Sequence, residues 1–349
     1  MKEKNLPEFK QSKITKLIRL PKKVVNIASI FAQDEEYFKS LFKEQFAYGH
    51  REILLKYCGL DFSTQIIGNL QHGVQVDRLH LRKSDLQSAR YFHGKKSTFW
   101  VFSTKYMQSA RYYGYKKVIA IGAPWLYLKK SITLKKDIRS KKRILLMPGH
   151  ESTTHPTRLT ADQKRERAAN YRKIVGDSSA IVCLHAVDFL DLEVRDAFRA
   201  ENFNVTCVGG SSLYPVWSDA ANRIKSLYTL MLLMNESDQL LTDRYGTHLF
   251  YAIDMGLDIA IHPNLFNYNS MEDASGRTGV LSPEELNSGE YRYLFENFPK
   301  AINEFTSSKE YKEISDEVLG ADAVLSASDL LNVLEYRGGI YPISPVQPW

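Results

Sequence analysis

The chain has 349 residues, of which 44% are hydrophobic, 25% charged and 12% aromatic. These fractions are typical of a globular protein and exclude low-complexity, collagen-like and coiled-coil classes. At roughly 150 residues per domain, the length predicts two domains. The opening sequence MKEKNLPEFK has no apolar signal-peptide core, and the longest apolar stretch, 227–234, is too short to span a membrane. We therefore expect a cytoplasmic protein.

The net charge of +7 comes mainly from two basic segments. Residues 1–23 hold eight Lys/Arg against two Glu, and residues 129–143 hold eight against Asp137 alone. Such clusters favour an anionic partner, although a solvated tail and a solvated linker explain them equally well. No nucleic-acid-binding module is visible, so we expect no nucleic acid. Apolar side chains alternate with lysines in residues 1–23, which makes an anionic membrane surface a candidate partner and the inner membrane a candidate location.

Three cysteines, Cys58, Cys183 and Cys207, are an odd and widely spaced set without a CxxC pair. This usage argues against both a disulfide framework and a structural zinc site, so we expect reduced thiols.

The first half of the chain predicts a mixed set of elements. In chain order they are a helix at 35–46, a strand at 63–68 running into the loop NLQHG, a strand at 98–103, a helix at 104–113 and a strand at 117–122. The basic stretch 129–143 then follows as the expected linker.

The second half is more regular, because apolar runs alternate with helical patterns. The predicted strands are 143–148, 180–185, 204–209, 239–243 and 258–263, and the helices between them are 160–175, 188–201, 219–235 and 247–256. This alternation predicts a parallel α/β sheet with helices on both faces. Residues 266–290 are expected to form a loop, and a helical segment at 308–335 ends the fold.

Polar residues follow the predicted strands of the second half, where ligands of open α/β sheets bind. Ser, Thr, His, Arg and Gly dominate this set, which suits a negatively charged ligand. The candidate phosphate- and donor-binding residues are His150, Glu151, Ser152, Thr153, Thr154, His185, Gly210, Arg244, Tyr245, Gly246, Thr247 and His248. Gly246 and Thr247 begin a helix whose N-terminus attracts phosphate. Thr247 is expected to cap this helix and to donate to a phosphate oxygen, the alternative being a cap alone.

His72, in the loop after the strand at 63–68, is the best candidate for a general base. The neighbouring Gly73 lets a substrate approach the backbone, and His50 with Arg51 gives a second, weaker candidate on the same side. The alternative is that His72 only bonds to the backbone. The spacing of His150, His155, His185 and His262 does not fit a metal site, so we expect neither metal nor cofactor. GxSxG, GxxxxGK[ST] and GxGxxG motifs are missing, which argues against a serine hydrolase, a P-loop NTPase and a dinucleotide oxidoreductase.

The order of these motifs resembles a known family. QHG (71–73), YGYKKVIAIGAPWLY (113–127), ILLMPGHEST (144–153) and LLTDRYGTHLFYAIDMGLDIAI (240–261) follow one another as in bacterial GT-B glycosyltransferases of capsule and lipopolysaccharide synthesis. The CDP-glycerol glycerophosphotransferases have the same order, and the His-Pro pair at 155–156 is similar to that of CMP-sugar transferases of the sialyl and Kdo type.

The resemblance implies an α/β, GT-B-like fold, in which two Rossmann-like domains turn their parallel sheets toward a central cleft. A basic segment (1–30) would precede an acceptor-side domain (31–135), a nucleotide-sugar-binding domain (136–310) and a C-terminal helical segment (311–349). His72 would be the base, His50, Arg51 and Gly73 would line the acceptor side, and Thr247 with its helix would hold the donor phosphate.

By the same resemblance, the expected activity is transfer of a sugar from a nucleotide-activated donor, preferably a CMP-sugar, to a saccharide or lipid-linked acceptor. Two alternatives stay open. One is a non-catalytic protein that binds anions or carbohydrates on the same scaffold, and the other is a sugar-nucleotide epimerase.

Overall fold

A computed structural model describes part of the chain. The described residues are 47–62, 64–66, 68–71, 73–74, 98–112, 114–135, 142–149, 159–208, 220–263, 289–334 and 336–337. By its internal contacts the chain divides into Met1–Ser40 and Leu41–Trp349, and every described residue belongs to the second unit. The predicted helix at 35–46, the basic segment at 1–30 and most of the predicted loop at 266–290 lie outside the described residues.

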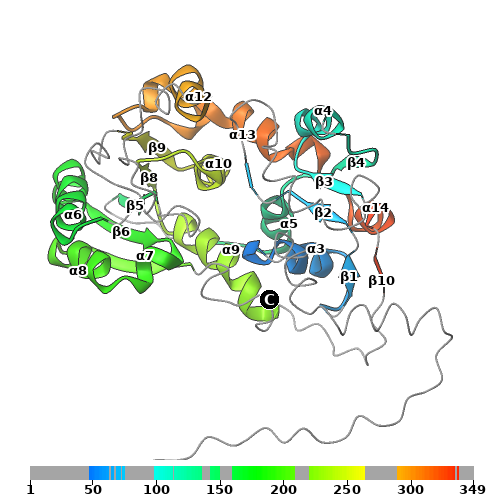
Figure 1. Ribbon diagram of the computed structural model, residues 1–349, viewed down its shortest axis with the longest axis horizontal. Helices are drawn as coiled ribbons and strands as arrows, with labels where there is room; N and C mark the ends of the chain where they lie inside the picture. Colours follow the sequence, from blue (N-terminus) through cyan, green and yellow to red (C-terminus); the bar gives the residue numbers. More distant parts are fainter. Residues whose placement is uncertain are drawn as a thin grey trace, which may run out of the picture. The chain divides into compact units, whose positions relative to one another are not determined.

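The helices and strands are labelled in Figure 1. The helices are α3 (His50–Tyr57), α4 (Thr104–Tyr112), α5 (Pro124–Ser131), α6 (Ala161–Val175), α7 (Ala186–Leu190), α8 (Leu192–Ala200), α9 (Ala220–Asn235), α10 (Thr247–Asp254), α12 (Gly289–Asn297), α13 (Lys312–Leu319) and α14 (Ala327–Val333). The strands are β1 (Gln65–Ile66), β2 (Asn69–Leu70), β3 (Phe99–Val101), β4 (Val118–Ala120), β5 (Arg143–Met147), β6 (Ser179–Leu184), β7 (Asn204–Cys207), β8 (Gln239–Thr242), β9 (Asp258–Ile261) and β10 (Tyr336–Arg337).

The architecture is α/β, as predicted, with two separate parallel sheets. The first sheet has the strand order β2-β3-β4, and the second has the order β7-β6-β5-β8-β9. Every pairing inside these two sheets is parallel. In the second sheet, β5 pairs with β6 on one side and with β8 on the other, so the strand order reverses there. A short antiparallel ladder of β1 with β10, which the sequence pattern does not predict, joins two distant segments of the chain.

The second sheet is buried on both faces, as its apolar strands predict. Along β5, Ile144 and Leu146 join one buried cluster with Tyr171 of α6 and Phe198 of α8. Leu145 points to the opposite face and joins the other cluster, which includes residues of α9 and α10. This alternation follows from the two-residue period of a strand, and Figure 1 shows α6 and α8 on the side of the sheet away from α9 and α10.

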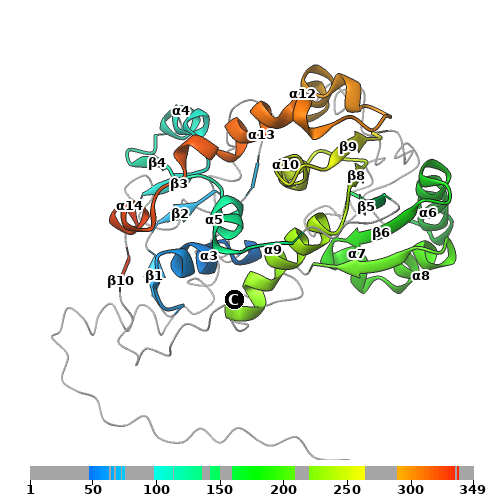
Figure 2. The same ribbon diagram turned by 180° about the vertical axis from the view of Figure 1, so that it is seen from behind.

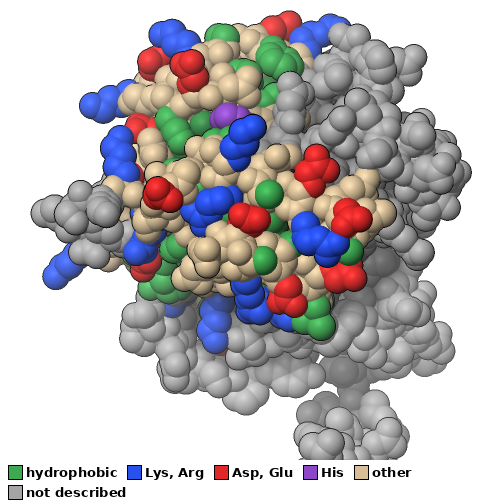
Figure 3. Space-filling view, turned by 90° about the vertical axis from the view of Figure 1, so that its left-hand side faces the viewer, with side chains coloured by type: hydrophobic (Ala, Val, Ile, Leu, Met, Phe, Trp, Pro, Cys, Tyr) green, Lys and Arg blue, Asp and Glu red, His purple; other side chains and the backbone are tan. Residues whose placement is uncertain are grey.

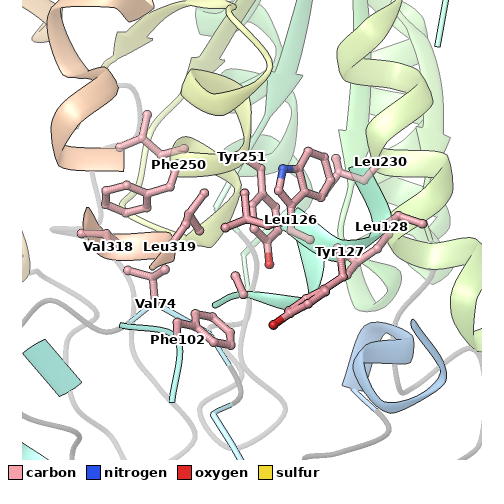
Figure 4. Packing of buried hydrophobic residues seen from close by; sticks show 14 of the residues in the cluster. Val74, Phe102, Leu126, Tyr127, Leu128, Leu230, Phe250, Tyr251, Val318 and Leu319 are labelled. Carbon is pink, nitrogen blue, oxygen red and sulfur yellow. The ribbon is translucent and has the colours of Figure 1, made fainter. Parts of the chain in front are cut away.

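The larger cluster extends from the second sheet to the first. It contains residues of α5, α9, α10 and α13 together with the ends of β2 and β3. Figure 4 shows this packing, with Leu126 of α5, Phe250 of α10 and Leu319 of α13 directed toward one another near Phe102. The indole ring of Trp125 stacks on Tyr251 with 4.2 Å between ring centroids, so α5 and α10 share one apolar interface.

The C-terminal helices return to the first sheet. Figures 1 and 2 both show the chain passing from α12 through α13 to α14, which lies beside β3. The Ser315 hydroxyl of α13 donates to the Phe250 carbonyl at 2.9 Å, and the Trp100 indole N–H of β3 donates to the Val333 carbonyl at 3.3 Å. The segment from α13 to α14 therefore contacts both α10 and the first sheet.

Two predicted helices are wrong in their extent. The segment expected as one helix at 188–201 contains the end of α7 and all of α8. The chain divides there because Asp191 is the N-cap of α8, and its carboxylate accepts hydrogen bonds from the Glu193 and Val194 N–H groups. The helix expected at 308–335 is divided into α13 and α14, since Gly320 ends α13 in the left-handed region at φ 69° and the Ser326 side chain caps α14.

Two further predictions in the first half need correction. The expected linker 129–143 begins later than predicted, because α5 continues to Ser131. The strand expected at 63–68 contains the short β1, but β1 pairs with β10 and not with the first sheet. The residues that pair with β3 are Asn69 and Leu70 of β2, in the segment expected to be a loop. In the part of the chain that the structure describes, no helix combines the length and apolar character needed to cross a bilayer.

Candidate functional site

The candidate site lies at the carboxyl ends of β5 and β8, where the strand order of the second sheet reverses. In open α/β sheets the loops at such a point diverge and leave room for a ligand. The described residues there are Gly149 after β5 and Asp243 to Gly246 after β8, followed directly by α10.

A buried ion pair holds these two strand ends together. Arg167 of α6 and Asp243 are 4% and 1% exposed, and their Nη2 and Oδ2 atoms are 3.0 Å apart. Arg167 Nη2 also donates to the Gly149 carbonyl, while the Gly149 N–H donates to Asp243 Oδ1 at 2.5 Å. The three residues thus form a closed set of charge-assisted hydrogen bonds.

The charge state of Asp243 follows from these contacts. Burial acts to raise the pKa of its carboxyl, but the Arg167 and Arg244 charges and the Gly149 N–H outweigh burial, so the pKa lies below the usual Asp value. Asp243 is therefore ionised at neutral pH. With two guanidinium groups acting on one carboxylate, the local charge favours an anionic ligand.

Residue 149 must lack a side chain because Arg244 packs closely against it. A Cβ at residue 149 would lie 2.3 Å from Arg244 Cδ, so any larger residue would displace the arginine side chain. The aliphatic stem of Arg244, a residue that the sequence predicts for the phosphate site, packs against Gly149 at the end of β5.

His248, the second residue of α10, contacts the end of β8. Its Nε2 lies 3.1 Å from the Thr242 hydroxyl, which donates to the Met147 carbonyl at 2.8 Å. The Thr242 hydroxyl thus connects the start of α10 to the carboxyl ends of β5 and β8. A Cβ at Gly246 would lie 2.7 Å from the imidazole, so glycine before the helix allows the ring to take this position.

The N-terminus of α10 differs from the prediction in one respect. Gly246 is the N-cap residue and no side chain caps the helix, so the predicted capping role of Thr247 is wrong. Thr247 is the first helical residue, and its Oγ1 accepts a hydrogen bond of 2.9 Å from the Val74 N–H. A Cβ at Gly73 would lie only 2.8 Å from the same oxygen. The loop after β2 therefore lies against the first turn of α10.

The loop after β2 is fixed by Gln71, which no sequence motif predicts as a site residue. The Gln71 side chain is buried, its Oε1 accepts from the Phe102 N–H at 2.9 Å, and its Nε2 donates to the Gly73 carbonyl at 2.9 Å. Arg167 was also missed, because a charged residue within a helix usually faces solvent. No sequence pattern distinguishes Gln71 and Arg167 from the glutamines and arginines whose side chains are exposed.

The carboxyl ends of β3 and β4 are covered by the chain itself. The Ala123 N–H donates to the Leu319 carbonyl at 2.8 Å, and a Cβ at Gly320 would lie 1.9 Å from the Phe102 carbonyl oxygen. The turn after α13 therefore packs against these two strand ends, and the loop after β2 is the one that meets α10.

His50 and Arg51 lie in α3 and are 1% and 6% exposed. The Arg51 guanidinium contacts Glu52 at 3.1 Å and donates to the Phe62 carbonyl at 3.0 Å and to the Thr64 carbonyl. The His50 ring lies 6.2 Å from that of Phe102, between centroids. Their contacts are thus with the protein interior, next to the end of β3.

The other described candidates lie around the second sheet. Tyr245 packs edge-on against Phe250 and Tyr293, with centroid distances of 5.7 and 6.1 Å. His185 follows β6, is half-buried, and its carbonyl accepts from the Phe189 N–H at 2.9 Å. The predicted site residues that lie outside the described part of the chain are His72, His150, Glu151, Ser152, Thr153, Thr154 and Gly210.

His262 follows β9, and burial lowers the pKa of its imidazole, which is therefore neutral at pH 7. Among the residues that the structure describes, no group of three or more His, Cys, Asp or Glu side chains is arranged to hold a metal ion.

Described basic residues of the stretch 129–143 contact acidic groups. Lys129 lies 3.0 Å from Asp254, and Arg143 lies 3.2 Å from Glu236. On the face seen in Figure 3, Lys/Arg and Asp/Glu side chains are interspersed rather than separated. Part of this basic stretch therefore stabilises contacts within the protein.

No protein-family model matches the chain, and the curated proteins contain no significant match. Its function must therefore be inferred from the fold and from the contacts around α10.

Proposed function

We propose that the chain is a metal-independent glycosyltransferase of the GT-B type. It transfers a sugar from a nucleotide-activated donor, preferably a CMP-sugar, to a hydroxyl of a growing bacterial surface polysaccharide. The second sheet holds the donor and the first sheet holds the acceptor. Lipid-linked acceptors would place the enzyme at the inner membrane face, with the basic segment 1–23 as the candidate membrane contact.

The observation that carries this proposal is the hydrogen bond of 2.9 Å between the Val74 N–H and Thr247 Oγ1. It joins the loop that follows a strand of the first sheet to the first residue of α10, which follows a strand of the second. A transferase needs an acceptor-activating group beside a leaving-group site, and this contact brings together the two segments that the sequence assigns to those roles.

The donor phosphate fits the N-terminus of α10 on three grounds. The first N–H groups of a helix have no partner within the helix, and its dipole attracts negative charge. Arg167 and Arg244 together outweigh the single negative charge of Asp243, which leaves net positive charge at the adjacent strand ends. The Thr247 hydroxyl accepts from Val74 through a lone pair, so its own proton can be donated to a phosphate oxygen.

The reaction follows from these roles. The acceptor hydroxyl attacks the anomeric carbon of the donor, forming a new C–O bond as the bond to the nucleotide phosphate breaks. His72, between Gln71 and Gly73 in the sequence, takes the hydroxyl proton. The helix N-terminus and the hydroxyl of Thr247 stabilise the charge that develops on the departing phosphate.

The proposal is tested with Thr247→Val and Thr247→Ser. Binding of CMP, CDP, UDP and GDP is measured by calorimetry, and transfer is measured with the sugar donor of the nucleotide that binds. We expect valine to weaken nucleotide binding about 10- to 100-fold, because a hydrogen bond to a charged group contributes roughly 1.5–3 kcal/mol. Serine keeps the hydroxyl and should bind within about threefold of the wild type.

The same assay separates the alternatives. Nucleotide binding without any turnover would favour a non-catalytic binding protein, and conversion of the donor without an acceptor would favour an epimerase. His72→Ala should abolish most transfer while leaving nucleotide binding intact, and near-wild-type turnover would exclude its role as the base. Equal nucleotide affinity in wild type and Thr247→Val would overturn the assignment of α10.

A further inference from the structure

Gln71 makes three hydrogen bonds at the end of β2, two of them through its side chain. The backbone N–H donates to the Trp100 carbonyl at 3.0 Å, as the parallel pairing with β3 requires. The side-chain Oε1 accepts from the Phe102 N–H at 2.9 Å, and Nε2 donates to the Gly73 carbonyl at 2.9 Å. The residue is 2% exposed, so its amide acts inside the protein and not in solvent.

These bonds continue to α10. Gln71 fixes the carbonyl of Gly73, and the next residue, Val74, donates its N–H to Thr247 Oγ1 at 2.9 Å. Gly73 lies so close to the same oxygen that a Cβ there would be only 2.8 Å from it. The backbone of the loop therefore has little room to move toward α10. A continuous series of contacts thus runs from the end of β3 through Gln71 and the loop to the first residue of α10.

Glutamine is the residue type that this arrangement requires. The side chain must accept from a backbone N–H and donate to a backbone carbonyl at the same time. Methionine has a similar length but neither group, and an ionised glutamate accepts without donating. Asparagine has both groups, but its side chain is one methylene shorter.

We infer that Gln71 is a positioning residue, which sets the distance between the loop after β2 and the N-terminus of α10. This inference rests on the proposed function, because the loop includes His72 in the sequence and α10 is the proposed phosphate site. Gln71 does not contact substrate. It acts through the backbone of Gly73 and Val74, so its loss displaces the acceptor side of the site while the donor side stays intact.

The first test measures loop position without any assay of activity. Amide hydrogen exchange is followed in the full chain for the wild type, Gln71→Met and the matched control Gln108→Met, whose side chain is exposed on α4. We expect faster exchange in peptides that contain Val74 for Gln71→Met only, with unchanged exchange in β5. Unchanged exchange at Val74 would overturn the inference whether or not the chain is a transferase.

The second test separates positioning from a general loss of structure. With a donor that the wild type uses, Gln71→Met should lower kcat about 10- to 100-fold, since misplacement by about 1 Å has effects of this size. The affinity for the nucleotide alone should change less than about threefold. An equal loss of nucleotide affinity, or an unchanged kcat, would overturn the inference.

Gln71→Glu provides a test that does not depend on the folding of the methionine variant. The ionised carboxylate keeps the acceptor for Phe102 but faces the Gly73 carbonyl without a proton to donate. A protonated carboxyl restores that donor, so the ratio of variant to wild-type kcat should rise as the pH is lowered. A ratio that does not change with pH would contradict the proposed role of the Nε2 donor.

Discussion

Asp243 shows how one residue links the fold to the candidate site. Its carboxylate is buried between Arg167 and the Gly149 N–H, at the carboxyl ends of β5 and β8. The pair fixes both loop origins, and its cost of desolvation is offset only while both charges are present. Removing one partner therefore affects stability as well as ligand binding.

Arg167→Met should lower the free energy of unfolding by about 3–5 kcal/mol at pH 7, because it leaves the carboxylate of Asp243 buried without its main cation. In the folded wild type the pKa of the Asp243 carboxyl is lowered. The ion pair therefore stabilises the fold fully at pH values above the ordinary Asp pKa of about 3.9. This stabilisation is lost as the pH falls through the lower pKa of the folded state. In the variant the main cation is missing, so burial raises the pKa of the Asp243 carboxyl. Protonation then removes the unpaired charge as the pH falls. The difference in free energy of unfolding between wild type and variant should therefore become smaller between pH 7 and pH 5.

Urea unfolding at several pH values measures this difference. The double variant Arg167→Met/Asp243→Asn is the control, since a neutral amide keeps the acceptor for Gly149 and should recover part of the loss. Equal stability of the wild type and Arg167→Met, or a deficit independent of pH, would contradict the interpretation.

At the scale of residues, the sequence predicts which side chains lie near one another better than it predicts their contacts. Arg244, Gly246, Thr247 and His248 were selected because polar residues follow β8, and the structure does place them together at the start of α10. The bond between Val74 and Thr247 could not be predicted, because it joins residues far apart in the chain through a hydroxyl that looked like a helix cap.

At the scale of elements, α13 depends on the residue that ends it. Gly320 takes φ 69°, and its Cα faces the Phe102 carbonyl so closely that a Cβ would lie 1.9 Å from the oxygen. The end of α13 is thus seated directly on the carboxyl end of β3. A side chain at this position must move the helix, the strand or both.

Gly320→Ala should reduce the free energy of unfolding by about 2–5 kcal/mol, through backbone strain together with overpacking. Gly256→Ala is the matched control, because Gly256 has φ 83° but nothing lies within 4 Å of a Cβ there. It should lose only the strain contribution, about 1–2 kcal/mol. Chemical denaturation of both variants measures the difference, and equal losses would show that contact with Phe102 has no effect.

Helices and strands of the second half were predicted well because long apolar runs alternate with amphipathic helices. Errors arose where one residue interrupts a pattern, as Asp191 does between α7 and α8 and Gly320 does after α13. In the first half, β3 and β4 lie inside the strands predicted at 98–103 and 117–122, whereas β2, with two residues, is too short for a periodic pattern to predict.

On the scale of the whole molecule, the first sheet depends on the C-terminal segment. Leu330 of α14 is fully buried, and the Trp100 indole of β3 donates to the Val333 carbonyl. Next to these contacts in the chain, β10 pairs with β1 in a separate two-stranded sheet. The sequence predicted the α/β class but not these pairings, because strand partners distant in the chain leave no local pattern.

Deleting residues 326–349 should therefore destabilise the first sheet selectively. Hydrogen exchange measured by mass spectrometry should show faster exchange in β2, β3 and β4 and little change in β5, β6 and β8, which pair only with one another and with their neighbours in the second sheet. Deletion of 338–349 alone keeps α14 and β10 and is the control. Uniform acceleration across both sheets would contradict a selective dependence.

The pairing of the C-terminal β10 with β1 affects the order in which the protein folds during translation. The strands of the second sheet are all available once residue 261 has left the ribosome, and the later segment that pairs with β9, at Ile302 and Thr306, follows soon after. The first sheet is translated earlier, but Trp100 of β3 waits for its partner at 333, and β1, which belongs to a separate two-stranded sheet, waits for 336–337. The N-terminal part of the described chain is therefore expected to be the last to mature, and a nascent chain stalled before α14 would expose apolar surface to chaperones.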